Sequence, residues 1–531
     1  MTGQHRSEKS KTMAKDRTTR SFQKVAFVAY EPWETRVANR FLQTLSEKNN
    51  QSESLLLVAD PFQIRNKRGS RRLRKLAAEA PHETAVVFRD LIGWQKKIPG
   101  MAAAEVDDRL SQIEEAEGID YLEAVMASDP HLKPRERSPF YGPMTTTEVR
   151  AASLLVFERV LEILDDFQPD VVVMMWDQYL VKNFVGALCR ARGIPVRVFR
   201  RVRFKDYLKL DYFFLPFEGA VNRSLETPTF RRELRDEVAA YGNSLYANNL
   251  AVIEASFVHR CRAAPLAAAG EVLKRAWKAQ VKKFKTGPLS RPAAYRHLRY
   301  WVSLAPRVHL YLLLKAARSL RYIFDRHTLA QPREIPNRFV VVPLHFRPES
   351  AILTQGLGIE DDDVVAAVAQ RLQEIDPTVT CVVLEHPSMI EDRRYSFYRK
   401  LKALGNVVIA DPVVPTQDLI RKALGVITIS GTVGLEASIA GIPVHVAGYP
   451  EFRPAIASQG EQSLADFLEQ CAQESGPVSR EPVLAYFERH CHDAWRGELG
   501  WAAIQSEEAL ATTVNTLLDM FRASQTETSI G

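Results

Sequence analysis

Short, continuously apolar runs alternate with amphipathic stretches in two separate blocks of this chain. In the first block, each apolar run has the length of a buried strand, and the amphipathic stretches place a hydrophobic residue at every third or fourth position. The predicted strands are 24–29, 54–58, 85–88, 170–176 and 196–199, and the predicted helices are 35–46, 148–167 and 181–192. This alternation predicts a parallel sheet that is covered by helices on both faces.

The second block begins near Asn337 and repeats the same pattern. Its predicted strands are 338–342, 380–384, 407–410, 425–429 and a run from 444, and its predicted helices are 361–375, 395–404, 416–422 and 435–440. The tail over 464–521 has helical periodicity. The fold class is therefore α/β, with two Rossmann-like domains of doubly wound parallel sheet.

The region between the blocks, 217–330, contains only helical patterns. We therefore predict four parts along the chain. They are a disordered tail over 1–22, a first Rossmann-like domain over 23–216, a helical insertion over 217–333 and a second Rossmann-like domain with a helical tail over 334–531.

The net charge of +7 conceals an asymmetry along the chain. From Ser256 to Arg326 there are 16 lysines and arginines against two acids, Glu271 and Asp325, so that this segment carries +14 and the remainder is net acidic. Tryptophan, tyrosine and phenylalanine residues are interleaved with the cations. This mixture suits a membrane interface or nucleic acid. The simpler alternative is a helical insertion that packs on the first domain and has a solvated basic face.

Nothing in the chain resembles a nucleic-acid-binding module, so we expect an anionic membrane surface as the partner of the basic segment. No apolar run reaches the ~18 residues of a membrane span. The start of the chain lacks the apolar region of a secretion signal. Five scattered cysteines show no paired spacing, which indicates a reducing compartment and no structural zinc site. We therefore expect a cytoplasmic protein, peripheral on the inner membrane.

The stretch 423–448 predicts a strand, a glycine-bearing turn and a short helix that stops at Gly441. A helix that begins just past a parallel strand exposes unpaired N–H groups at the positive end of its dipole, which suits a phosphate. Gly434 lies inside this helix, where glycine costs roughly 1 kcal/mol relative to alanine. Close approach of the backbone to a ligand or to another element would explain that cost.

Three side chains of this turn and helix can contribute. Ser430 can cap the helix, Thr432 can donate its hydroxyl, and Glu436 lies on the same helix face as Thr432, where it can accept from ribose hydroxyls. The alternative is a plain strand–helix turn whose glycines are needed for packing, because short glycine motifs often occur by chance.

Other polar residues follow predicted strands, where parallel sheets bind their ligands. Glu31 follows the first strand, Asp177 follows the strand 170–176, and His386 follows 380–384, held extended by Pro387. For each carboxylate, the alternative is a helix cap or a turn residue. The acidic run 360–363 favours the start of a helix rather than a metal site.

Three segments of the second block occur in a characteristic order: PLHFRPES (343–350), EHPSM (385–389) and SGTVGLEA (430–437), with GIPV after the last. This series resembles the capsule polysaccharide biosynthesis family, which includes the bacterial Kdo transferases of capsule export. The resemblance implies a GT-B architecture, with two Rossmann-like domains that face a cleft. It also implies metal-independent glycosyl transfer with no cofactor beyond the nucleotide-sugar substrate, which is held mainly by the C-terminal domain.

Carried over residue by residue, the resemblance implies that His386 donates to the nucleotide phosphate, together with the turn residues Ser430, Gly431 and Thr432. It implies that Glu436 binds the ribose. The cleft is implied to be lined by His345, Arg347 and Glu349.

The chain departs from the family pattern at two positions. Leu384 stands where a lysine is expected before Glu-His-Pro, and Glu391-Asp392 stand where a glycine is expected. Arg393 or Arg394 could replace the missing cation.

The leading hypothesis is a glycosyltransferase of surface-polysaccharide synthesis. It would transfer a Kdo-like sugar from a CMP-linked donor to a lipid-linked or glycan acceptor, with Asp177 as the first candidate for the base and Glu31 as the second. Three alternatives remain open: a sugar-nucleotide 2-epimerase, a glycerophosphotransferase of wall polymers, and a catalytically inactive protein that binds export machinery, with Leu384 as the mark of lost catalysis.

Overall fold

The computed structural model describes most of the chain. The described residues are 22–48, 53–59, 75, 78, 80, 82–87, 97–129, 145–176, 179–202, 207–212, 264–286, 298–324, 329–330, 332–347, 350–356, 358–457, 462–473, 476–492 and 494–526. The chain divides into two compact units. Unit 1 comprises Met1–Met126, Thr147–Phe214 and His490–Gly531, and unit 2 comprises Ala127–Thr146 and Leu215–Arg489.

Unit 1 is built on a seven-stranded sheet in the order β12-β6-β5-β4-β1-β2-β3. The strands are β1 (Lys24–Ala29), β2 (Glu53–Val58), β3 (Glu83–Val86), β4 (Val171–Met175), β5 (Val196–Arg201), β6 (Tyr207–Tyr212) and β12 (Trp495–Arg496). Strands β1 to β5 are parallel, whereas β6 and β12 form an antiparallel edge that the sequence pattern did not predict. The central strands are buried on both faces, which explains their unbroken apolar runs.

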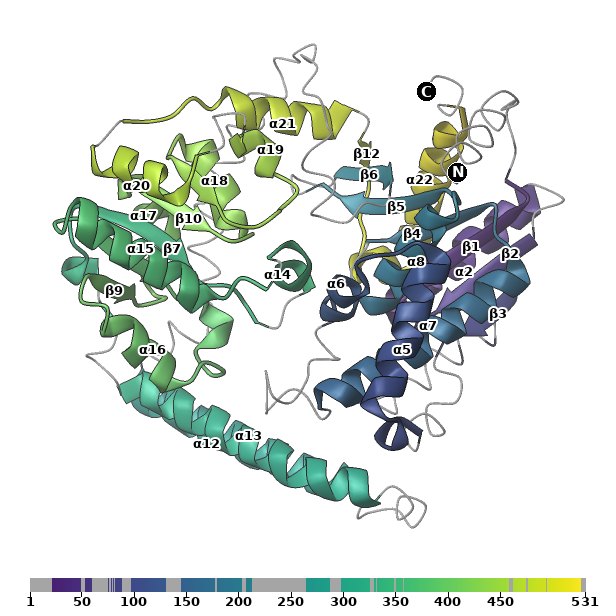
Figure 1. The fold of residues 1–531 in the computed structure, drawn as a ribbon, viewed down its shortest axis with the longest axis horizontal. Helices are drawn as coiled ribbons and strands as arrows, with labels where there is room; N and C mark the ends of the chain where they lie inside the picture. The colour runs from purple at the N-terminus through teal and green to yellow at the C-terminus, as the bar shows by residue number, and fades with distance from the viewer. Residues whose placement is uncertain are drawn as a thin grey trace, which may run out of the picture. The chain divides into compact units, whose positions relative to one another are not determined.

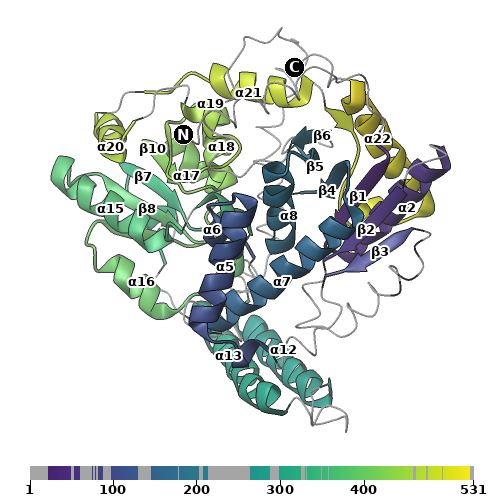
Figure 2. The same ribbon diagram turned by 45° about the vertical axis from the view of Figure 1, so that its right-hand side comes forward.

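Helices cover both faces of this sheet. They are α2 (Pro32–Lys48), α5 (Ala103–Glu117), α6 (Leu122–Ala127), α7 (Thr146–Phe167), α8 (Leu180–Ala191) and α22 (Glu507–Thr526), with short 3₁₀ turns at Ile98–Gly100 and Ala502–Ile504. Figures 1 and 2 both show the yellow α22 beside the purple α2. The Phe521 ring lies 5.7 Å from that of Phe41, centroid to centroid.

The position of α22 corrects the predicted domain boundaries. We expected the C-terminal helical tail to belong to the second domain, but residues from His490 onward lie in unit 1. Fully buried Leu517 and Phe521 fill the core of that unit. Apolar periodicity shows that a helix has a buried face, but it does not show which sheet that face covers.

Unit 2 contains a five-stranded, all-parallel sheet in the order β11-β10-β7-β8-β9. Its strands are β7 (Phe339–Pro343), β8 (Thr380–Leu384), β9 (Val407–Ala410), β10 (Gly425–Thr428) and β11 (Val444–Val446). Its α-helices are α14 (Ser350–Gln355), α15 (Asp361–Ile375), α16 (Tyr395–Lys402), α17 (Thr416–Lys422), α18 (Thr432–Ala440), α19 (Arg453–Ala457), α20 (Leu464–Ala472) and α21 (Glu481–His492). The 3₁₀ turns are η6 (Pro332–Glu334) and η7 (Pro387–Met389).

The five parallel strands of each unit have the same connectivity. In each, the first strand is central, the second and third lie to one side and the fourth and fifth to the other. Two Rossmann-like, doubly wound units are thereby confirmed. In such sheets a ligand binds beyond the carboxyl ends of the strands, where the strand order reverses. That point lies between β1 and β4 in unit 1 and between β7 and β10 in unit 2.

The described part of the basic insertion forms two long helices, α12 (Pro265–Thr286) and α13 (Leu298–Phe324), which pack side by side (Figures 1 and 2). This α12–α13 pair belongs to unit 2, not to the first domain as the simpler alternative had it. Val272 and Ile323 enter the core of unit 2, and the Tyr322 hydroxyl donates to Asp411 over 2.9 Å. Among the described residues, no helix is long and apolar enough to cross a membrane.

Candidate functional site

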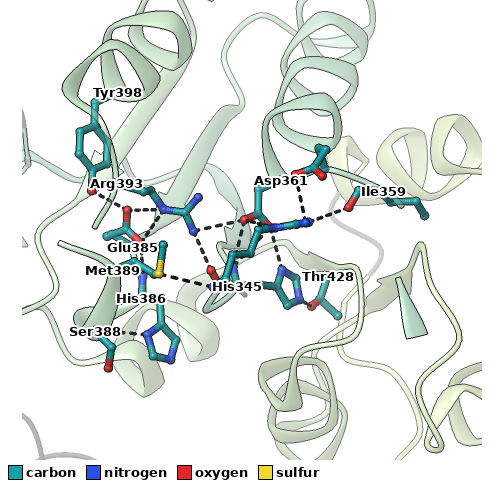
Figure 3. A network of polar contacts seen from close by, with 12 residues as sticks. His345, Ile359, Asp361, Glu385, His386, Ser388, Met389, Arg393, Tyr398 and Thr428 are labelled. Atoms are coloured by element: carbon teal, nitrogen blue, oxygen red, sulfur yellow. Dashed lines mark hydrogen bonds and ion pairs between the residues drawn. The ribbon is translucent and has the colours of Figure 1, made fainter. Parts of the chain in front are cut away.

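Three strand exits converge at the carboxyl edge of the sheet in unit 2, beside the point of strand-order reversal. His345 lies just beyond β7, Glu385 follows β8 directly, and Ser430 lies two residues beyond β10. Because these strands are neighbours and parallel, their exits meet at one edge (Figure 3). The three motif segments PLHFRPES, EHPSM and SGTVGLEA thus each place a residue at this one edge.

His345 connects the exits of β7 and β10. Its Nδ1 lies 2.8 Å from a carboxylate oxygen of Asp361, and its Nε2 lies 3.3 Å from the backbone nitrogen of Ser430. A backbone N–H can only donate, so Nε2 is the acceptor and the ring proton resides on Nδ1, facing Asp361. His345 is 7% exposed and Asp361 3%. His345 therefore supports the turn after β10 from within the protein.

Asp361, the first residue of α15, collects several donors. Besides His345, it accepts from Arg347 Nε over 3.3 Å and from Arg393 Nη2 over 3.2 Å. Burial alone would raise the pKa of this carboxyl, but the His345 hydrogen bond and the positive charges of Arg393 and Arg347 lower it to about 2. The carboxylate is therefore ionised at neutral pH. The acidic start of this helix gave no indication of this pairing.

Arg393 connects the exits of β7 and β8. Its Nε lies 2.8 Å from a Glu385 oxygen, and its Nη2 donates to the His345 carbonyl over 2.7 Å. The Tyr398 hydroxyl and the His386 amide also donate to Glu385, each over 2.6 Å. Burial raises the pKa of Glu385, while Arg393 and these donors oppose that shift. We call His345, Asp361, Glu385, Arg393 and Tyr398 the edge network.

The His386 ring lies apart from the edge network (Figure 3), although the His386 amide donates to Glu385, and the ring caps η7. Its Nδ1 accepts from the Ser388 amide over 3.2 Å, which leaves the ring proton on Nε2. Burial and the nearby positive charge of Arg393 lower the pKa of His386. At neutral pH the half-buried ring is therefore uncharged, with Nε2–H as its donor.

The turn from β10 into α18 corrects one prediction. Gly431, not Ser430, is the N-cap of α18, and no side chain caps this helix. The Gly431 amide donates to Thr428 Oγ1 over 3.0 Å. A Cβ on Gly431 would lie 3.0 Å from that oxygen and 3.3 Å from His345 Nε2. The glycine thus allows the strand and His345 to approach the turn closely.

Gly434 is explained by packing. A Cβ there would lie 2.8 Å from Cγ2 of Thr428 on β10, closer than real Cβ atoms come to other atoms. Of the two explanations left open by the sequence, close approach to another element is the one observed. The amides of Thr432 and Val433 at the start of α18 have no carbonyl partner within the helix, as at any helix start.

Glu436 lies one turn into α18 and accepts a hydrogen bond from Gln417 of α17. Burial raises the pKa of this carboxyl to about 7, because Gln417 supplies a donor but no positive charge. Glu436 can therefore change protonation state near neutral pH.

The remaining predicted site residues have different positions. Arg347 is largely buried and donates to the Ile359 carbonyl over 2.6 Å as well as to Asp361, and Arg394 is exposed. Leu384 is buried at the end of β8. Glu349 and Asp177 lie outside the described residues. Among the described residues, no three histidine, cysteine or acidic side chains are placed to hold a metal ion.

The edge of unit 1 has its own buried ion pair at the point of strand-order reversal. Lys182 Nζ lies 2.9 Å from a Glu34 oxygen and also donates to the Met175 carbonyl, and both side chains are almost fully buried. Trp176 (φ 52°) and Tyr179 (φ 78°) flank position 177 in the left-handed region. Such backbone costs about 1–3 kcal/mol per residue and occurs often at functional sites.

Glu31 lies at the exit of β1, in the same part of unit 1. It accepts from the Trp33 indole over 2.8 Å. A contact of this kind is what the alternative of a turn carboxylate predicts. Glu31 nevertheless lies at the exit of β1, where a base was predicted.

Comparison with known proteins agrees with the motif series. Residues 267–486 match the family model described as capsule polysaccharide biosynthesis protein, which confirms the predicted resemblance. No curated protein sequence matches the chain.

Several solved structures are similar at low identity. The β-Kdo 2,4-transferase KpsC of Thermosulfurimonas dismutans is 13% identical, over 59% of this chain and 78% of that one, with a TM-score of 0.30. The UDP-GlcNAc 2-epimerase of Neisseria meningitidis, bound to UDP-GlcNAc, is 13% identical over 88% of this chain and 99% of that one, with a TM-score of 0.23. With TM-scores of this size, the fold class rests on the two sheets themselves.

The edge network predicts unequal roles for two adjacent arginines. Arg393→Met leaves Glu385 and Asp361 buried without their shared cation, and it should lower the free energy of unfolding by about 3–5 kcal/mol. Arg394→Met, at the exposed neighbouring position, should change it by less than about 0.5 kcal/mol. Urea denaturation of both variants measures the difference. Equal effects would show that Arg393 does not hold the network together.

The raised pKa of Glu436 predicts a pH-dependent stability. The unfolded carboxyl ionises near 4.5 and the folded one near 7, so wild-type protein loses stability as the pH rises through this interval. Glu436→Gln removes this ionisation. Its effect on the free energy of unfolding should therefore be more stabilising at about pH 8 than at about pH 4, by about 3 kcal/mol. Urea denaturation at both pH values tests this, with Glu498→Gln at an exposed position of unit 1 as the control. The prediction would be refuted if Glu436→Gln changed the free energy of unfolding by the same amount at both pH values.

Proposed function

Because residues 267–486 match the family of capsule polysaccharide biosynthesis proteins, we propose that the chain is a glycosyltransferase of surface-polysaccharide synthesis. The nucleotide of its sugar donor binds at the carboxyl edge of unit 2. The observation that carries this proposal is the convergence of His386, the turn at Gly431 and the edge network at the exits of three neighbouring strands.

The edge suits a leaving phosphate. The first amides of α18 and the Nε2–H of His386 are donors, and negative charge develops on the phosphate as the sugar departs. The edge network keeps these donors in place, since His345 holds the Ser430 amide and Glu385 holds the His386 amide. Fixed donors need no reorganisation during the reaction. In this proposal, amide and imidazole groups meet the phosphate charge, and the transfer requires no metal ion.

Glu436 is the proposed ribose contact. It lies on the face of α18 that begins with Thr432, and as a carboxylate it would accept from two ribose hydroxyls. We propose a CMP-linked, Kdo-like sugar as the donor and a lipid-linked or glycan molecule as the acceptor, on the basis of the family. The base that deprotonates the acceptor hydroxyl would come from unit 1, with Asp177 preferred over Glu31.

Nucleotide binding tests the unit 2 site. His386→Ala and Glu436→Ala should each weaken binding by about 1–3 kcal/mol, the range for a hydrogen bond that involves a charged group. Isothermal titration with CMP, CDP, UDP and GDP measures the loss. His445→Ala is the matched control, because that ring packs on Phe467 of α20. If both site variants retained wild-type affinity for every nucleotide, the assignment would be wrong, and tight binding of UDP alone would favour the epimerase alternative.

Turnover tests the proposed base separately from donor binding. Asp177→Asn should lower the rate of nucleotide release from the donor sugar by at least about 100-fold, while its donor affinity stays close to wild type. Glu31→Gln, at the exit of the neighbouring strand, should have the smaller effect. Near-normal turnover in Asp177→Asn would exclude Asp177 as the base and make Glu31 the remaining candidate. Normal turnover in both variants would remove unit 1 carboxylates from the mechanism.

A further inference from the structure

We propose that the outer face of the α12–α13 pair docks on an anionic lipid surface. Most of the large hydrophobic side chains that are clearly exposed among the described residues lie on these two helices: Leu266, Leu273, Trp277, Leu310, Leu313 and Phe324. An exposed apolar surface of this kind on a water-facing helix pair indicates a binding partner.

On α12 the exposed apolar side chains form one stripe. Leu266, Leu273 and Trp277 are separated by seven and four residues, so they project from the same side of the helix. Leu266 is 80% exposed and Trp277 72%. Ala268 and Val272 project from a different side and are buried in the core of unit 2. The stripe therefore does not face the protein interior of its own unit.

The second helix repeats this arrangement. Leu310, Leu313 and Phe324 of α13 are each more than half exposed, whereas Tyr322 and Ile323 are buried against unit 2. Both helices of the pair therefore anchor one face on the unit and present leucine and an aromatic ring on another face. The two adjacent helices thus expose six large apolar side chains between them, and side chains of this kind can enter the headgroup region of a bilayer.

Among the described side chains of the pair, two cations contact the rest of unit 2 and two others are exposed beside the stripe. Lys315 pairs with Asp392 over 3.0 Å, and Arg318 donates to the Asp392 carbonyl over 2.6 Å, so these two hold the pair against unit 2. Lys274 and Lys278, one turn apart on α12, are exposed next to the apolar stripe. This is the composition of an interfacial helix, with apolar side chains bordered by lysines that meet anionic headgroups.

Charge selects a lipid surface over the other possible occupants. A second copy of the chain would bring the same basic segment, with its 16 lysines and arginines, against itself, and like charges repel. Nucleic acid would attract the cations, but it offers little contact to exposed leucines. An anionic bilayer accommodates both the cations and the apolar stripe. The contact is interfacial, since neither helix can cross a membrane.

This proposal does not depend on the proposed sugar transfer. If the chain bound vesicles but no nucleotide, the docking surface would stand and the transferase assignment would fail. If it bound a nucleotide but no vesicles, the transferase assignment would stand and the docking surface would fail. For an enzyme that uses a lipid-linked acceptor, docking would keep the protein at the surface where the acceptor is concentrated.

Co-sedimentation of the full chain with vesicles tests the proposal. At low salt the protein should sediment with vesicles of phosphatidylcholine and phosphatidylglycerol, and it should remain largely in solution with phosphatidylcholine alone. Lys274→Glu/Lys278→Glu should lower partitioning by at least about 25-fold, because each lysine near an anionic surface contributes about fivefold. Added salt should weaken binding of the wild type, since it screens these charges.

The apolar stripe requires its own variant. Leu273→Ala/Trp277→Ala should lower partitioning by about tenfold or more, because the lost side chains no longer leave water. Trp501→Ala, at a tryptophan of unit 1 that is 53% exposed, is the matched control and should bind as the wild type does. Lys48→Glu/Lys422→Glu is the control for charge, at exposed lysines of α2 and α17 that are not part of the pair. Circular dichroism should show that all variants keep the wild-type helical content.

Three outcomes would overturn the proposal. The first is a failure to sediment with anionic vesicles at low salt. The second is a loss of vesicle binding in the control variants as large as the loss in the α12 variants, which would indicate general charge attraction. The third is a dimer that Leu273→Ala/Trp277→Ala converts to a monomer, which would show that the stripe is covered by a second copy.

Discussion

The buried guanidinium of Arg393 is the contact on which the proposed site depends. It lies between Glu385 and Asp361, two carboxylates with almost no exposure to water, and it also donates to the His345 carbonyl. Removing one partner of such a group leaves an uncompensated buried charge. With the guanidinium in place, Asp361 is ionised and fixes the proton of His345 on Nδ1, which in turn leaves Nε2 to accept the Ser430 amide. Directly and through Asp361 and His345, this one cation thus holds the exits of three strands together.

Much of the fold could be predicted because its strands are buried on both faces. Continuous apolar runs such as β4 and β8 are recognisable in the sequence, and the order of strands and helices implied a doubly wound sheet. The antiparallel edge of the unit 1 sheet was harder to predict. β6 carries Lys209 and Asp211 among its apolar residues, and β12 has only two residues. Pairing of β12 with β6 joins segments almost 300 residues apart, which no local pattern encodes.

The site was predictable where topology alone decides it. Residues that follow parallel neighbouring strands must meet at one edge, and His345, His386 and Ser430 do so. The supporting groups were not predictable. Asp361 has the appearance of a helix-start carboxylate, and Tyr398 has the appearance of a core residue of α16. Arg393 and Arg394 are equivalent in the sequence, and only the structure shows that Arg393 is buried between two carboxylates while Arg394 faces solvent.

The central claim is that a nucleotide binds at the carboxyl edge of unit 2. Hydrogen–deuterium exchange with and without the nucleotide that binds most tightly tests it most directly, because it locates the protected amides along the chain. The account predicts slower exchange in two segments, 385–390 and 430–436, with the amides of Thr432 and Val433 among those protected. Protection confined to other parts of the chain, with these two segments unchanged, would contradict it.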